Sequence, residues 1–200
     1  MSAKQIEVWI EFGSPYTHIA VQTIEDKARN AGLSIVWRPF LIGAIFQLQG
    51  YTDTPVNLFK PKGNYMWRDM VRQCEALNVP YKKPDIFPIN GITAARIATA
   101  ADGQPWQGDF IRETFMSYFY QGQDITSPAI LSEALNKGGC SDIEAALNTA
   151  TLPEIKDKLK ARTQEAINRG IFGSPSFFVG DELFWGSDRI EQAVAFASSR

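Results

Sequence analysis

Ser14 lies where a strand-like segment meets a helix-like segment, and from there a hydroxyl group can act on a bound ligand. The sequence reads Phe-Gly-Ser-Pro-Tyr-Thr over residues 12–17. Pro15 suits the first position of a helix, so Ser14 precedes that helix and its free backbone amides. A hydroxyl cannot form a disulfide, but it can donate to a thiolate that arrives with a ligand, and the helix dipole favours the same negative charge. The alternative is a serine that only caps the helix.

Ser174 and Pro175 form a second candidate site, directly before the apolar run at 176–179. Proline cannot donate to a sheet, so at the entry of a strand it is tolerated mainly at an edge or as the first residue. The bond between the two residues is compatible with the cis form. We expect the backbone N–H and C=O of Ser174 to be free to pair with an extended peptide by strand addition.

The elements that must position these residues follow from hydrophobic periodicity. Residues 5–12 and 33–38 are predicted as strands and residues 15–30 as the helix between them, so the two strands would be parallel neighbours. Short strands at 176–179 and 183–185, joined by a Gly-Asp-Glu turn, predict a hairpin, and a last helix is expected over 187–198.

The middle of the chain has a different pattern, which favours a block of helices. The predicted helices are 66–77, 92–101, 106–120, 128–136 and 153–168. Residues 46–64 contain two glycines and two prolines with little periodicity, so we expect an irregular segment there.

Composition narrows the classes of function. The chain has 200 residues, 44% hydrophobic residues and a formal net charge of −2, so no basic surface for nucleic acid is expected. The N-terminus does not resemble a secretory signal, and no stretch approaches the roughly 20 apolar residues needed to span a membrane, which predicts a cytoplasmic protein without a membrane partner. Cys74 and Cys140 are far apart, and neither a metal cluster nor a phosphate-binding loop is present in the sequence.

Taken together, these motifs resemble the 2-hydroxychromene-2-carboxylate isomerase family. That family groups with kappa-class glutathione transferases and DsbA-like proteins in the thioredoxin superfamily. The resemblance covers nearly the whole chain and rests on an ordered set of segments: 12–16, 38–46, 62–66, 170–179 and 182–189. It implies an α/β thioredoxin-like fold with an all-helical domain inserted after the second strand. The thioredoxin-like domain would comprise 1–41 and 170–200, and the insertion 42–169. Ser14 and Thr17 would then occupy the positions of the two cysteines of a redox relative.

The resemblance also implies a homodimer that binds glutathione between the two domains. Ser14 would meet the glutathione sulfur, and Ser174, before Pro175, would pair with the cysteinyl backbone. Lys62 would lie near the substrate or the glycyl carboxylate. The segment expected at the γ-glutamyl end is Trp185, Gly186, Ser187 and Asp188.

One segment departs from the family pattern. The family usually shows an asparagine where this chain has Asp53. A carboxylate close to an anionic aromatic substrate is unfavourable unless it is protonated or paired, for which Lys62 is a candidate. Asn57 could take the role of the amide instead.

Other residues have simpler interpretations. His18, the only histidine, could act as a general base, although a packing or solvent-facing role is the more common one. Asp102, Asp109 and Glu113 are interpreted as a solvated helix face, and the aromatic residues at 106–119 as core.

The first hypothesis is therefore a glutathione-dependent isomerase that interconverts 2-hydroxychromene-2-carboxylate and trans-o-hydroxybenzylidenepyruvate in aromatic hydrocarbon catabolism. A kappa-like glutathione transferase or peroxidase would use the same Ser14 but consume glutathione. A non-catalytic thiol- or peptide-binding module is the alternative from another class.

Overall fold

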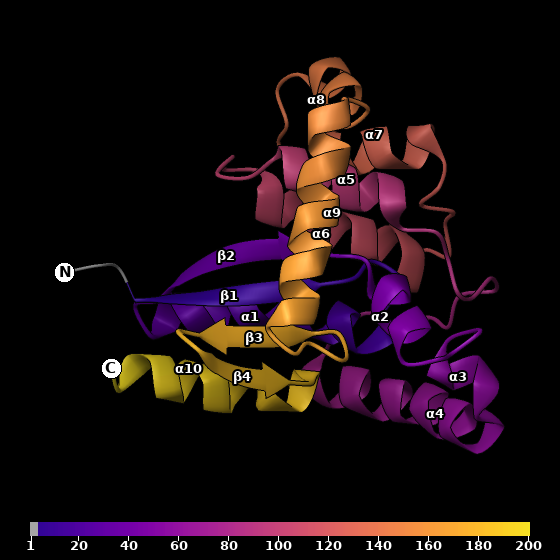
Figure 1. Cartoon of the computed structure of the whole chain (residues 1–200), viewed down its shortest axis with the longest axis vertical. Helices are drawn as coiled ribbons and strands as arrows, with labels where there is room; N and C mark the ends of the chain where they lie inside the picture. Colours follow the sequence, from indigo (N-terminus) through magenta and orange to yellow (C-terminus); the bar gives the residue numbers. More distant parts are fainter. Residues whose placement is uncertain (1–3) are drawn as a thin grey trace.

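Four strands form one mixed sheet in the computed structural model, which describes residues 4–200 (Figure 1). Its order is β2-β1-β3-β4. The strands are β1 (Gln5–Ile10), β2 (Ser34–Pro39), β3 (Ser176–Val179) and β4 (Glu182–Trp185). β1 runs parallel to β2, while β3 is antiparallel to both β1 and β4. The parallel pair and the C-terminal hairpin are thus confirmed.

Helices surround this sheet and fill the long connection between β2 and β3. They are α1 (Pro15–Asn30), α2 (Ile42–Leu48), α3 (Pro55–Leu58), α4 (Lys60–Leu77), α5 (Ile92–Ala100), α6 (Gln107–Phe119), α7 (Pro128–Lys137), α8 (Ile143–Thr149), α9 (Pro153–Asn168) and α10 (Ile190–Ser198), with a short 3-10 turn, η1, at Ser187–Arg189. Figure 1 shows α5 to α8 gathered beyond one edge of the sheet and α9 running from this group across the strands, while α2, α3 and α4 lie together at one end.

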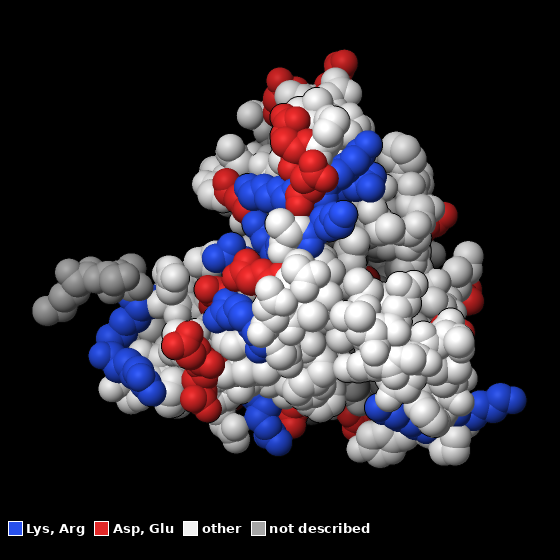
Figure 2. All heavy atoms as spheres, in the orientation of Figure 1, with Lys and Arg blue, Asp and Glu red and all other residues white. Residues whose placement is uncertain are grey.

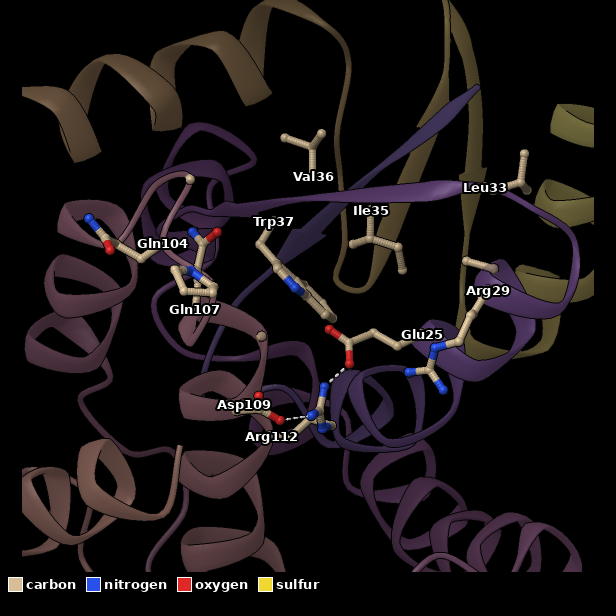
Figure 3. Close-up of a pocket in the computed structure, with 14 residues that line it drawn as sticks. Glu25, Arg29, Leu33, Ile35, Val36, Trp37, Gln104, Gln107, Asp109 and Arg112 are labelled. Atoms are coloured by element: carbon tan, nitrogen blue, oxygen red, sulfur yellow. Dashed lines mark hydrogen bonds and ion pairs between the residues drawn. The ribbon is translucent and has the colours of Figure 1, made fainter. Parts of the chain in front are cut away.

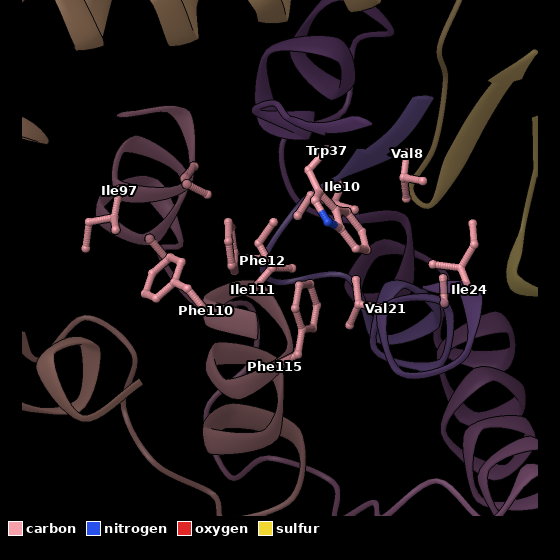
Figure 4. Close-up of a cluster of buried hydrophobic side chains, with 14 of the residues drawn as sticks. Val8, Ile10, Phe12, Val21, Ile24, Trp37, Ile97, Phe110, Ile111 and Phe115 are labelled. Atoms are coloured by element: carbon pink, nitrogen blue, oxygen red, sulfur yellow. The ribbon is translucent and has the colours of Figure 1, made fainter. Parts of the chain in front are cut away.

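Alternating side chains of β1 pack into two apolar clusters, one on each face of the sheet. Ile6, Val8 and Ile10 are fully buried in the larger cluster, which also receives side chains of α1, α5 and α6 (Figure 4). Trp9 points to the opposite side and packs edge-on against Phe40 and Phe178, with ring centroids 6.1 and 6.3 Å apart. Each fully buried side chain of this size stabilises the fold by roughly 1.5–3 kcal/mol relative to an exposed one.

The larger cluster extends from the sheet into the inserted helices. Phe12, just after β1, stacks on Phe115 of α6 with ring centroids 5.3 Å apart, and Phe110 adjoins both. Packing of α6 therefore fixes the segment that leads from β1 to Ser14. The division into 1–41 with 170–200 and 42–169 stays a prediction.

The expectation of an irregular segment at 46–64 is wrong in part. Residues up to Leu48 continue α2, residues 55–58 form α3, and α4 already begins at Lys60. Pro61 lies in the first turn of α4, where a missing N–H costs nothing. Helix α8 was also not predicted from the sequence, and its seven residues begin at an Asp142 cap that accepts a hydrogen bond from Ala145.

Candidate active site

Ser14 stands at the start of α1, and its hydroxyl is directed away from the helix. Its side chain makes no capping hydrogen bond, so the interpretation as a cap alone is wrong. The Oγ–H instead donates to the backbone carbonyl of Ser174 over 2.8 Å. The first turn of α1 has no acidic residue, and Lys27 and Arg29 lie in its last turn. The amides of the first turn therefore remain available to an anion at Ser14.

Ser174 is linked to three parts of the site. The bond between Ser174 and Pro175 is cis. The Ser174 Oγ accepts from the N–H of Glu11 over 3.0 Å and lies 2.8 Å from the Oγ1 of buried Thr17. Within residues 4–200 its N–H donates no hydrogen bond, whereas its carbonyl accepts from Ser14. The expectation that both backbone groups are free is thus wrong for the carbonyl and holds for the N–H.

Trp185 covers this loop because Gly173 leaves room for it. A Cβ on Gly173 would lie 2.2 Å from the indole Nε1, and the ring of Phe172 is 5.0 Å from that of Trp185. The N–H of Gly186 donates to the carbonyl of Pro175 over 3.0 Å. The segment 185–186 is therefore held against the cis-proline loop.

The next two residues lie outside the cavity described below. Ser187 donates to the Gln73 side chain of α4 over 3.2 Å, and Asp188 forms a 3.2 Å ion pair with its neighbour Arg189. The same Gln73 donates to Asp69, which also accepts from the Tyr16 hydroxyl over 3.0 Å. A polar chain thus connects η1 to the first turn of α1.

One cavity of about 920 Å³ brings most of the predicted site residues together. Five of them line it: Ser14, Asp53, Lys62, Ser174 and Trp185. Pro175, Gly186, Ser187 and Asp188 do not, although they adjoin it through the contacts above. Several aromatic residues that were not singled out from the sequence also line the cavity: Tyr16, Phe46, Tyr51, Tyr65, Phe87 and Phe172.

The surface beside this cavity carries little charge. Figure 2 shows charged side chains gathered over α9 and near the N-terminal end of the sheet, whereas the region over α2 is largely uncharged. A cavity lined by aromatic rings with a few polar groups suits a small aromatic ligand.

Asp53 reaches the cavity from the segment just before α3, and Lys62 from the first turn of α4. A Cβ on Gly63 would lie 2.4 Å from the carbonyl oxygen of Val56, so glycine permits the close packing of the two helices. Both oxygens of Asp53 accept from the side-chain amide of Asn57 over 3.1 Å. The carboxylate forms no ion pair with Lys62 in the described chain, so that expected pairing is wrong.

Glu11 is the polar cavity residue that sequence reasoning missed. Its Oε2 accepts from the N–H of Gly13 over 3.0 Å. Burial raises the pKa of this carboxyl to about 7, although the Gly13 N–H acts in the opposite direction. An acidic residue at the end of a strand, three positions before Ser14, was the available signal.

His18 takes the packing role. It is fully buried against Phe119, and its Nε2 lies 2.8 Å from the carbonyl oxygen of Pro80, which fixes the proton on that nitrogen. Burial lowers its pKa to about 4. Since His18 does not line the cavity, it is not placed to act as a base for Ser14.

Asp102 is less solvated than expected, whereas Asp109 is exposed, as predicted. Asp102 is partly buried and forms ion pairs with Lys158 and Arg162 of α9, which lower its pKa although burial alone would raise it. Asp109 pairs with Arg112. The ion pairs of Asp102 join the loop before α6 to α9, and the pair of Asp109 lies within α6.

A second cavity of about 670 Å³ lies between α1, β2 and α6 and contains none of the predicted site residues. Figure 3 shows Arg112 between Glu25 and Asp109, with ion pairs to both. Its central charges are therefore already satisfied within the protein.

The described residues contain no group of His, Cys, Asp and Glu that could hold a metal ion. Both cysteines are free and buried, and burial raises the pKa of Cys74 to about 11. Within residues 4–200 no helix has the length and apolar character needed to cross a membrane.

The fold and this site define a class of protein. The model of the DsbA-like thioredoxin domain family matches residues 5–196. The chain therefore belongs to that family, and the predicted thioredoxin-like fold is confirmed.

Comparison with individual relatives identifies one family within this class of protein. A 2-hydroxychromene-2-carboxylate isomerase of Sphingobium xenophagum is 30% identical over 189 residues, which cover 94% of this chain and 95% of the relative. A structure of 2-hydroxychromene-2-carboxylate isomerase superposes with a TM-score of 0.84 at 21% identity, covering 98% of this chain and 95% of that one. Human glutathione S-transferase kappa 1 is 26% identical over 201 residues, covering 94% and 88% of the two chains. The chain belongs to the 2-hydroxychromene-2-carboxylate isomerase family and is an enzyme of the isomerase class.

Proposed function

We propose that this enzyme uses glutathione to interconvert 2-hydroxychromene-2-carboxylate and trans-o-hydroxybenzylidenepyruvate. The observation that carries the proposal is the hydrogen bond between Ser14 and Ser174 at the N-terminus of α1, inside a cavity lined by aromatic rings. Support also comes from the similar isomerases and kappa-class transferases. The cytosolic disulfide reductase DsbM from Pseudomonas aeruginosa, solved with GSH, shares the fold with a TM-score of 0.68 at 11% identity.

Glutathione would enter as an extended peptide beside Ser174. The free N–H of Ser174 can donate to the cysteinyl carbonyl, and the Ser174 carbonyl can accept from the cysteinyl N–H. Once that carbonyl has a peptide partner, the Ser14 hydroxyl is released to donate to the thiolate. A charge-assisted hydrogen bond is about twice as strong as a neutral one, so the exchange of partners is favourable.

The remaining predicted contacts fit the two ends of the peptide and the substrate. Trp185 would cover the peptide, and the turn formed by Gly186, Ser187 and Asp188 would meet the γ-glutamyl group. Lys62 would attract the carboxylate of the substrate or of the glycyl end. Asp53, held by Asn57, would accept from a hydroxyl group of the substrate rather than face its carboxylate.

In the reaction, the hemiketal ring opens to an unsaturated ketone, and the glutathione thiolate adds to its conjugated carbon–carbon double bond. The electron pair moves to the ketone oxygen as an enolate, and the bond that the addition made single can rotate. Expulsion of the thiolate then gives the trans product and regenerates glutathione. A thiolate positioned by the protein before the encounter removes the entropic cost of a bimolecular addition.

The experiment that tests this function is turnover of 2-hydroxychromene-2-carboxylate with and without glutathione, with free thiol measured at the end. We expect turnover that depends on glutathione and leaves the thiol concentration unchanged. Stoichiometric loss of thiol with a general electrophile, and no isomerisation, would instead support the kappa-like transferase. Equal rates without glutathione would exclude both.

A further inference from the structure

Glu11 is held at the centre of the site by three bonds. Its N–H donates to the Ser174 Oγ over 3.0 Å, its carbonyl accepts from the N–H of Ser14 over 3.1 Å, and its Oε2 accepts from the N–H of Gly13 over 3.0 Å. It lines the same cavity as Ser14. The position of this carboxyl group is therefore fixed by the residues that would hold glutathione.

The second oxygen of this carboxyl remains available. Within residues 4–200, Oε1 accepts no hydrogen bond and Glu11 forms no ion pair. A Cβ on Gly13 would contact both carboxyl oxygens, at 3.3 Å from Oε2 and 3.5 Å from Oε1, so glycine leaves the carboxyl uncovered on this side. An oxygen without a partner beside an open cavity can reach a bound ligand.

Within residues 4–200 no basic side chain pairs with the Glu11 carboxylate, and its charge is stabilised by the N–H of Gly13. Burial and, to a smaller extent, the charge of Glu11 raise the pKa of Tyr118 of α6, a neutral phenol whose hydroxyl donates to the carbonyl of Ile86. The titratable groups along the cavity wall are Tyr16, Asp53, Lys62 and Tyr65. Burial raises the pKa of Glu11 to about 7, so both the acid and the carboxylate are populated near neutral pH, as proton transfer in both directions requires.

The proposed reaction contains a proton transfer that a thiolate does not perform. Opening the ring of a 2-hydroxychromene moves one proton from the hydroxyl on the hemiketal carbon to the ring oxygen on the same carbon. Both oxygens are bonded to one atom, so a single carboxyl group can reach both. The Ser14 hydroxyl is engaged with the thiolate and cannot serve.

We propose that Glu11 is the catalytic acid–base residue of ring opening, an assignment that rests on the function proposed above. The Glu11 carboxylate takes the proton of the hemiketal hydroxyl, whose oxygen becomes the ketone as the bond from carbon to the ring oxygen breaks. The resulting carboxylic acid gives the same proton to the phenoxide. No net proton, electron or co-reactant is consumed, and ring closure uses the same steps in reverse.

Other groups near the cavity are less suited to this proton transfer. The carboxylate of Asp53 is exposed and occupied by Asn57. The hydroxyl of Tyr16 donates to Asp69, and burial together with this carboxylate raises its pKa above the ordinary value. His18 lies outside the cavity, and its Nε2–H donates to the carbonyl of Pro80.

The test compares two substrates in the wild-type enzyme and in Glu11→Gln. One is the hydroxychromene carboxylate, which must open its ring. The other is cis-benzylidenepyruvate, which lacks the phenolic hydroxyl and needs only addition and expulsion of the thiolate. The amide of glutamine can still accept from Gly13 but cannot carry a proton between two oxygens.

We expect Glu11→Gln to lower kcat on the ring substrate by roughly 10²–10⁴-fold. Its kcat on cis-benzylidenepyruvate and its calorimetric Kd for glutathione should change less than about threefold. Glu182→Gln, an exposed residue of the same sheet, is the matched control and should leave both reactions unchanged. Equal losses on both substrates, or ring-substrate activity retained within threefold, would overturn the role of Glu11 while leaving the glutathione-dependent function intact.

A wild-type measurement keeps the proposal testable if Glu11→Gln does not fold. The pH profile of kcat should show an ionisation near 7 with the ring substrate that is missing with cis-benzylidenepyruvate. The same profile for both substrates would contradict the proposal. Wild-type enzyme with no glutathione-dependent turnover of the ring substrate would overturn the proposed function and the role of Glu11 with it.

Discussion

The hydroxyl of Ser14 donates to the backbone carbonyl of Ser174 over 2.8 Å and so joins the start of α1 to the loop before β3. The two residues are 160 positions apart in the sequence. Because a hydroxyl has one proton, this bond must be given up when Ser14 meets a thiolate, and a peptide N–H at Ser174 can replace it.

Ser14→Ala should therefore separate activity from stability. We expect a roughly 10²-fold loss of kcat, because removing a hydrogen-bond donor to developing charge has an effect of this size. The free energy of unfolding should fall by only about 1 kcal/mol, since one neutral hydrogen bond disappears. Steady-state kinetics and urea unfolding measure the two effects. As a control, Ser132→Ala removes an exposed hydroxyl on α7 and should change neither kcat nor the free energy of unfolding. Turnover in Ser14→Ala within a few-fold of wild type would refute this role of Ser14.

Thr17→Val tests whether the second cysteine-equivalent position is structural. The Thr17 hydroxyl is fully buried and lies 2.8 Å from the Ser174 Oγ. Losing it should lower the free energy of unfolding by about 1–2 kcal/mol and raise the Kd for glutathione, because Ser174 loses one of its anchors. Thr23→Val, on the same helix, removes only a bond to the carbonyl of Ile19. Urea unfolding and calorimetry should show the smaller effect in Thr23→Val, and equal effects would contradict the prediction.

Gly63→Ala should affect substrate affinity through backbone packing. The added Cβ would meet the Val56 carbonyl oxygen at 2.4 Å, so α3 must move away from α4. We expect a loss of about 1–3 kcal/mol in stability and a higher KM for the substrate, since Asp53 and Lys62 are displaced. Gly43→Ala in α2 meets no atom within 4 Å and should be neutral or stabilising, as alanine favours a helix. A KM unchanged in Gly63→Ala would show that this packing does not position the substrate residues.

His18 and Glu11 should influence stability in opposite directions over overlapping pH ranges. The pKa of His18 falls from 6.5 to about 4 on folding, so the unfolded chain binds more protons between these values and stability is lost as pH falls. For Glu11 the pKa rises from 4.5 to about 7, so its contribution is lost as pH rises through that range.

Glu11→Gln should reveal the contribution of His18 to the pH dependence of the free energy of unfolding. Between pH 4.5 and 6.5 the wild-type contributions partly cancel, whereas the variant should gain up to about 3 kcal/mol with rising pH from His18 alone. Near pH 7 the variant should also be more stable than the wild type, because no carboxylate is buried. Unfolding curves at several pH values measure both; a variant with the same pH dependence as the wild type would contradict the raised pKa of Glu11.

The sequence predicted the features that depend on local pattern. Alternation predicted β1, Pro15 predicted the start of α1, and the Gly-Asp-Glu turn predicted the final hairpin. The meeting of Ser14 with Ser174 required the fold, which the resemblance supplied. α8 was missed because a seven-residue helix offers barely two turns of periodicity. The segment before α4 was misjudged because Gly63 was interpreted as a helix breaker, whereas it serves contact with Val56.

The pairing of side chains and their pKa values could not be predicted from local sequence patterns. From the sequence, Lys62 was the candidate partner of Asp53 and Asn57 the alternative residue for its role, whereas in the structure Asn57 itself donates to Asp53. The raised pKa of Glu11 depends on the burial of its carboxyl in three dimensions, which the pattern around residue 11 does not give.

The most direct test of the account is the ionisation of glutathione bound to the enzyme, followed by the ultraviolet absorbance of its thiolate during a pH titration. A free cysteine thiol has a pKa of about 8.5. We predict a pKa for bound glutathione at least one unit lower, with most of that shift lost in Ser14→Ala. A bound thiol that titrates as in free solution, or a shift that survives in Ser14→Ala, would contradict the central claim that Ser14 stabilises a thiolate supplied by the ligand.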